Sequence, residues 1–114
     1  MACPYALTVD GFESQLATNH LGPFLFTNLI RARILASASP RIVNVSSKGH
    51  TITDILYSDP EFSKGQTYNI WTAYGQSKTA NVLFAVALKE RWGVEAFSLH
   101  PGSTPSSLYL SKHN

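Results

Sequence analysis

Two short apolar runs separated by a helix-length segment are the feature that most constrains the fold of this chain. The first run, residues 41–46, follows Pro40 and is rich in β-branched side chains with little alternation. Such a run is typical of a strand covered on both faces. The second run, residues 94–99, ends at the turn residues 100–102. Because the helical pattern of residues 73–92 would connect the two strands by a crossover, the sequence predicts a parallel α/β sheet.

Apolar periodicity predicts two long helices beside these strands. Over residues 10–39 apolar side chains recur at three- and four-residue steps, as in an amphipathic helix. Residues 73–92 repeat that pattern with many small side chains, and Gly93 is expected to end the helix. Residues 47–71 mix turn-forming residues with isolated aromatics, which indicates a long loop with a functional role. Two strands alone do not make a stable sheet of this class.

The composition fits one folded domain and argues against several classes of protein. The chain has 114 residues, of which 44% are hydrophobic and 14% charged, so it can bury a core. The net charge is only +2 and the basic residues are scattered, so nucleic acid is not expected as a partner. Cys3 is the single cysteine, which excludes an intrachain disulfide. No apolar run has membrane-span length and no secretory signal is recognisable, so we expect a cytoplasmic protein without a membrane span.

Several catalytic motifs are missing from the sequence. The four histidines lie far apart and show no zinc-ligand spacing, so no metal site is expected. The G-x-S-x-G pattern of hydrolases does not occur. Neither does a G-x-G-x-x-G or Walker loop for phosphates.

Tyr74 and Lys78 form the pair most suggestive of chemistry. They stand four residues apart on the predicted second helix, so their side chains share one face. A nearby ammonium favours the ionised phenol and lowers its pKa from about 10. Such a phenol can exchange a proton with an alcohol or carbonyl oxygen. The spacing also arises by chance, and its surroundings therefore decide its weight.

Those surroundings place hydroxyl groups at the same edge of the predicted sheet. Ser46 and Ser47 end the first predicted strand, and residues 100–102 follow the second. Open parallel sheets bind their ligands at the carboxyl ends of the strands. A serine there could hold a substrate oxygen for Tyr74 to protonate. Each feature alone is also an ordinary turn former.

Four segments together resemble the short-chain dehydrogenase/reductase family. They are Asn-His-Leu-Gly at 19–22, Arg-Ile-Val-Asn-Val-Ser-Ser at 41–47, Tyr-Gly-Gln-Ser-Lys at 74–78 and His-Pro-Gly at 100–102, in the family's order. The resemblance is to the retinol-dehydrogenase-like branch common among fungal oxidoreductases, and it covers residues 1–107. It implies an NAD(P)-dependent enzyme that interconverts an alcohol and a carbonyl. It also implies a doubly wound Rossmann-type domain, of which residues 1–114 form the catalytic half.

The resemblance also implies roles for individual residues. Tyr74 would be the acid–base group, and Ser47 would orient the substrate oxygen. Lys78 would hold the nicotinamide ribose and lower the pKa of Tyr74, while Asn19 would anchor a proton-relay water. The cofactor, NAD or NADP, would contact five residues: Tyr74, Lys78, Pro101, Gly102 and Ser106.

Two further expectations concern the loop and the first helix. The larger side chains of the loop would either border the substrate or tie the loop down: His50, Ile55, Tyr57, Phe62, Tyr68 and Trp71. Pro23 has no N–H to offer the carbonyl of Asn19, four residues earlier, and predicts a kink there. We expect the kink to expose that carbonyl to a water shared with Lys78. The alternative is a tolerated kink without a role.

The family's first βαβ unit and glycine-rich phosphate loop precede the matched region. The resemblance therefore implies weakened NAD(P) binding by this chain. An alternative is a catalytically silent fragment or an interaction module that pairs through its helices. In either case we expect a homodimer through residues 10–39 and 73–92.

Overall fold

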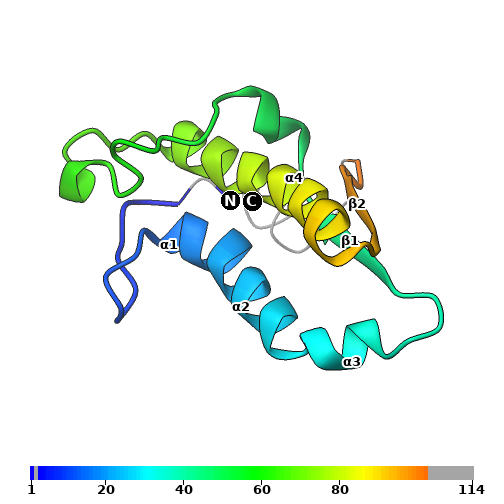
Figure 1. Cartoon of the computed structure of the whole chain (residues 1–114). Helices are drawn as coiled ribbons and strands as arrows, with labels where there is room; N and C mark the ends of the chain where they lie inside the picture. Colours follow the sequence, from blue (N-terminus) through cyan, green and yellow to red (C-terminus); the bar gives the residue numbers. More distant parts are fainter. Residues whose placement is uncertain (2, 103–114) are drawn as a thin grey trace, which may run out of the picture.

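Two parallel strands and one long helix form the centre of the structure. The computed structural model describes residues 1 and 3–102. Strand β1 (Arg41–Val45) pairs in parallel with β2 (Glu95–Leu99). Helix α4 (Ile70–Trp92) connects them and packs against both (Figure 1). The two strands begin and end opposite each other, so their carboxyl ends lie at one edge. The predicted α/β class, part of a Rossmann-type domain, is confirmed.

The segment predicted as one helix over residues 10–39 is shorter and interrupted. Thr8 and Gly11 close a tight turn, with Gly11 at φ +84°, and the helix begins only after it. The Glu13 carboxylate caps the start by accepting the backbone N–H groups of Gln15 and Leu16. At Ile30 the backbone leaves helical geometry, at φ −95° and ψ 8°. The observed segments are α1 (Ser14–Leu16), the π-helical turn η1 (Ala17–Leu21), α2 (Gly22–Leu29) and α3 (Arg31–Leu35).

Helix α4 agrees closely with its prediction and begins slightly earlier. The side chain of Asn69 accepts the backbone N–H groups of Trp71 and Thr72, which fixes the first turn. At the other end Gly93 takes the left-handed conformation at φ +67°, and its N–H bonds to the carbonyl of Lys89. A glycine tolerates this conformation without steric cost, so the helix ends where predicted.

The loop between β1 and α4 is long, as predicted, and its middle and second half are held by contacts with other segments. It contains two short 3₁₀ turns, η2 (Lys48–Thr51) and η3 (Ser63–Gly65). The buried Gln76 side chain accepts the N–H of Leu56 and donates to the carbonyl of Pro60. Phe62 is buried and packs edge-on against Tyr68, whose hydroxyl bonds to the carbonyl of Cys3. Some aromatics therefore tie the loop down, whereas Tyr57 and Trp71 remain exposed.

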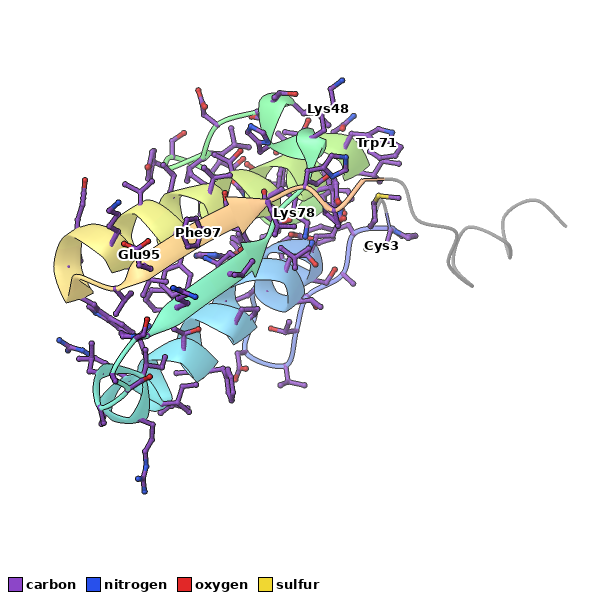
Figure 2. All side chains as sticks on the ribbon, turned by 90° about the vertical axis from the view of Figure 1, so that its right-hand side faces the viewer. Cys3, Lys48, Trp71, Lys78, Glu95 and Phe97 are labelled. Atoms are coloured by element: carbon purple, nitrogen blue, oxygen red, sulfur yellow. The ribbon has the colours of Figure 1, made fainter. Side chains whose placement is uncertain are left out.

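One face of the sheet is packed and the other is open. Phe84 and Leu88 of α4 and Val94 form the buried core beneath the sheet. On the opposite face Val43 is 54% exposed and Phe97 50% exposed. Figure 2 shows Phe97 on the side of the sheet turned away from α4. None of the helices in the described part of the chain is long and apolar enough to cross a membrane.

Candidate active site

The two serines after β1 have different hydrogen-bond partners and different roles. The N–H of Ser46 donates to the carbonyl of Leu99 at 2.8 Å, and its hydroxyl donates to the carbonyl of Lys78, also at 2.8 Å. Ser46 is buried and joins β1 to β2 and to α4. Ser47 has extended backbone, and its hydroxyl accepts the N–H of Gly49 at 3.1 Å to start η2. Ser46 is thus structural, and Ser47 is the serine that faces the site.

Tyr74 and Ser47 meet at Gly49. A Cβ atom placed on Gly49 would lie 2.8 Å from Cε1 of Tyr74 and 3.5 Å from Oγ of Ser47. The phenol ring therefore packs directly on the Gly49 backbone, next to the Ser47 hydroxyl. Tyr74 is half-buried in the second turn of α4. Its hydroxyl forms no hydrogen bond with any residue that the structure describes. That hydroxyl is available for a substrate oxygen.

Lys78 lies one helical turn beyond Tyr74, at the same edge. Its Nζ donates to the carbonyl of Val45 at 3.2 Å and lies 5.6 Å from the centroid of the Tyr74 ring. Burial lowers the pKa of Lys78 from its ordinary value. Figure 2 shows Lys78 near the carboxyl ends of the strands, at the opposite end of the sheet from Glu95. The Lys78 ammonium therefore lies beside the Tyr74 ring at the edge where the strands end.

Asn19 reaches the site from the π-helical turn η1. Its side-chain amide donates to Oγ of Ser77 at 2.9 Å. The hydroxyl of Ser77 is fully buried and donates to the backbone carbonyl of Tyr74 at 2.7 Å. Asn19 is thus linked through one hydroxyl to the backbone that carries Tyr74. All four residues predicted as catalytic come together around the carboxyl end of β1.

The helical segment before Pro23 contains the π-helical turn η1, and the carbonyl of Asn19 has a different neighbour from the predicted water. The N–H of Gly22 reaches back to the carbonyl of Ala17, and this wide turn directly precedes Pro23. The carbonyl of Asn19 was expected to face a water shared with Lys78. In the structure it accepts the side-chain N–H of Asn81 at 3.0 Å. A buried amide thus occupies the place predicted for water.

Asn81 is the site residue that sequence reasoning missed. It is 6% exposed and follows Lys78 by three residues and Tyr74 by seven, so all three share one helix face. An asparagine among small apolar residues at this spacing was a usable signal. Buried side-chain amides need several partners, and such a position predicts a network.

The predicted cofactor residues at the second strand lie at the expected edge. Pro101 and Gly102 follow the carboxyl end of β2 and are exposed, with Gly102 in the left-handed conformation at φ +83°. Ser106 lies outside the described residues. The register of the strands places Pro101 and Gly102 at the same edge as Ser47.

The donors at this edge fit the nicotinamide ribose of a dinucleotide. An ammonium has three N–H donors, and Lys78 uses one of them on Val45. The remaining donors, together with the free Tyr74 hydroxyl, suit a diol and a reacting oxygen. The glycine-rich loop that would hold the phosphates does not occur in this sequence. Among residues 1 and 3–102, no group of three His, Cys, Asp or Glu side chains could hold a metal ion.

Comparison with known proteins finds relatives along nearly the whole chain. Retinol dehydrogenase 12 of Bos taurus is 46% identical over 111 residues, which are 95% of this chain and 34% of that protein. Retinol dehydrogenase 11 of Homo sapiens is 44% identical over the same shares. A short-chain dehydrogenase/reductase of Penicillium roqueforti is 43% identical, over 95% of this chain and 33% of its own length.

A solved structure has a similar fold over nearly the whole chain. The crystal structure of an uncharacterised protein from Mycobacterium paratuberculosis superposes with a TM-score of 0.81 at 43% identity, covering 96% of this chain and 41% of that one. No protein-family model matches the chain. The chain spans about a third of the length of the curated relatives it matches.

Proposed function

We propose that this chain, which belongs to the short-chain dehydrogenase/reductase family and is related to its retinol dehydrogenases, carries the acid–base site of an NAD(P)-dependent oxidoreductase. The reaction would interconvert an alcohol and a carbonyl. The observation that carries the proposal is the meeting of Ser47 and Tyr74 at Gly49, with the Lys78 ammonium 5.6 Å from the phenol ring. The 43–46% identity to named dehydrogenases supports it.

The residues of this chain would handle the proton of the reaction. Lys78 and the turn at Pro101 and Gly102 would hold NAD(P)(H), which would supply the hydride chemistry at the carbon atom. In reduction the Tyr74 hydroxyl donates its proton to the substrate oxygen, and in oxidation the phenolate takes that proton from the alcohol. The Ser47 hydroxyl donates to the same oxygen and orients it. The Lys78 ammonium lies beside the phenol ring, and Asn19 fixes the Tyr74 backbone through Ser77.

Apolar alcohols and aldehydes are the substrate class that we propose. Trp71 is 48% exposed and lies in the first turn of α4, one turn before Tyr74. Figure 2 shows Trp71 at the same end of the sheet as Lys48 and Cys3. Tyr57 and the half-buried Ile55 come from the adjoining loop. Exposed aromatic surface of this kind suits an apolar ligand, and relatives of the chain are named retinol dehydrogenases.

A turnover assay tests this proposal. The protein is incubated with NADH or NADPH and a panel of aldehydes that includes retinal, and with NAD or NADP and the matching alcohols. Cofactor absorbance at 340 nm should change in the presence of apolar substrates and stay constant with charged ones of similar size. Absence of any cofactor-dependent turnover across the panel would refute the enzymatic proposal for this chain.

We also propose a homodimer, and helix-mediated association without turnover is the second candidate function. An apolar groove of about 330 Å³ lies between α1–α2 and α4. Its apolar lining comes from both helical segments and from the loop: Leu16, Leu21, Phe24, Ile55, Pro60, Ala80, Leu83, Phe84 and Ala87. A groove of this character suits the helices of a second copy.

Sedimentation velocity of two variants tests whether the groove is the dimer surface. Leu83 lines the groove and is 46% exposed, so Leu83→Lys should shift a dimer to monomer. Leu29 is 75% exposed outside the groove, and Leu29→Lys is the matched control. Equal effects of the two substitutions, or none, would remove the groove as the dimer surface. A dimer without turnover would favour the second candidate.

A further inference from the structure

Asn81 joins three segments that carry the site. It lies on α4, and its side chain bonds to η1 and to the end of β1. The Nδ2 group donates to the carbonyl of Asn19 at 3.0 Å and to the carbonyl of Val45 at 3.2 Å. Asn44 of β1 donates to the backbone carbonyl of Asn81 at 3.3 Å. The two bonds donated by Nδ2 fix the orientation of the Asn81 amide.

His20 accounts for the remaining atom of the amide. Because both Nδ2 hydrogens of Asn81 are donated, its Oδ1 must be the atom 3.1 Å from Nδ1 of His20. An oxygen accepts, so Nδ1 of His20 carries the hydrogen. Burial lowers the pKa of His20, which keeps the ring neutral between Phe24 and Phe84. The amide is thus held at every polar atom.

The carbonyl of Val45 connects this network to the ammonium. It accepts both from Nδ2 of Asn81 and from Nζ of Lys78, each at 3.2 Å. Both lone pairs of that oxygen are therefore used. Asn19 is fixed twice, through its side chain to Ser77 and through its carbonyl to Asn81. Asn81 is the common neighbour of the two residues that flank Tyr74.

We infer that Asn81 is a positioning residue for the acid–base site: it holds the carbonyls of Asn19 and Val45 together and so fixes the Lys78 ammonium against Tyr74. Its consequence for catalysis rests on the proposed function. Its consequence for Lys78 does not, since the contacts exist in the chain itself. Removing the Asn81 amide takes the side-chain donor from the Asn19 carbonyl and leaves the Val45 carbonyl with Lys78 alone, so Lys78 or water must move to replace the lost bonds.

Two readouts test the inference on the same proteins. The first is titration of Lys78 by the ¹³Cε chemical shift, which needs no cofactor or substrate. In the unsubstituted protein Lys78 should titrate below its ordinary pKa, and in Asn81→Ala it should return toward that value. After the substitution Lys78 can gain contacts with a carbonyl or with water. Either contact stabilises the ammonium, so both raise the pKa of Lys78 toward its ordinary value. The second readout is turnover, in which kcat should fall about 100-fold with little change in KM, as for a displaced reacting group.

Thr27→Ala is the matched control, because Thr27 is also buried and bonds to a backbone carbonyl, that of Pro23, away from the site. The control should leave the Lys78 titration and kcat unchanged. If Asn81→Ala does not fold, Asn81→Ser replaces it. We then expect a smaller rise in the pKa of Lys78 and a smaller fall in kcat. An unchanged Lys78 titration in a folded Asn81 variant would overturn the inference. Absence of turnover in the unsubstituted protein would count against the proposed function alone, and the titration would still decide the inference.

Discussion

Buried polar side chains around the site are all paired, and this limits what can change there. Gln76, Ser77 and Asn81 are each less than 7% exposed, and each forms a hydrogen bond with another segment of the chain. Across the described residues no buried side-chain nitrogen or oxygen lacks a partner. A network of this kind is stable only when complete, since an orphaned buried group costs about 1–3 kcal/mol. The buried polar side chains around the reactive groups thus hold the site in place.

Lys78→Met should separate the chemical role of the ammonium from its structural role. The substitution keeps an unbranched apolar stem, and the Val45 carbonyl still accepts from Asn81. We expect turnover to fall about 100-fold or more, because the charge beside the phenol is lost, while the melting temperature changes little. Steady-state rates and thermal melts check both parts. Loss of the fold together with the activity would contradict the assignment.

His20 should make the stability of the protein depend on pH. Burial lowers its pKa in the folded state below the ordinary 6.5, so the unfolded chain binds a proton more readily. This contribution to stability is therefore present above pH 6.5 and is lost as pH falls through the lower folded value. Urea unfolding at several pH values measures it. In His20→Gln, which can still donate to Asn81, the decrease from this group should disappear, and an unchanged decrease would contradict the prediction.

At the scale of elements, strand and helix positions follow from local pattern, while breaks follow from contacts. The β-branched run at 41–46, the periodicity over 73–92 and the stop at Gly93 predicted β1 and α4 to within a few residues. The interruptions over residues 10–39 arise from the Gly11 turn, the Glu13 cap and the π-helical turn. Apolar periodicity registers none of these, because Phe12 continues the pattern inside the turn.

Asn69→Ala tests the cap that positions the first turn of α4. The Asn69 side chain accepts two backbone N–H groups, and its loss should destabilise the protein by about 1 kcal/mol. Asn28→Ala, which removes an exposed bond to the carbonyl of Phe24, is the control and should change stability less. Chemical denaturation compares them. An equal loss of stability in Asn69→Ala and Asn28→Ala would show that the cap does not stabilise the protein more than an ordinary exposed hydrogen bond.

At the scale of the whole molecule, the open sheet face is the dominant feature. Val43, Val45, Phe97 and Leu99 each expose 42–55% of their surface on that face. The β-branched run at 41–46 predicted a strand covered on both faces, and the described chain covers one face of β1. The candidate site is nevertheless assembled, because its contacts come from described elements: β1, β2, α4, η1 and η2. Asn19, Ser47, Tyr74 and Lys78 were identified from sequence motifs, whereas the partners of Asn81 on η1 and β1 follow only from the packing of three segments.

Phe97→Ser should reduce the binding of an apolar fluorescent dye and the self-association of the protein. The change removes the largest side chain from the open face, where Phe97 is 50% exposed. Tyr57→Ser is the control, because Tyr57 is 83% exposed but lies on the loop. Dye fluorescence and light scattering measure the effect. If dye fluorescence and light scattering decreased more in Tyr57→Ser than in Phe97→Ser, the open sheet face would not be the surface that binds the dye and self-associates.

The most direct test of the acid–base site is to compare turnover of the protein and of Tyr74→Phe with NAD(P)(H) and an apolar aldehyde. Removing the hydroxyl disturbs no hydrogen bond among the described residues, so the variant should fold with an unchanged melting temperature. We predict measurable turnover in the unsubstituted protein and a loss of at least about 100-fold in the variant. Turnover that survives in Tyr74→Phe would contradict the account.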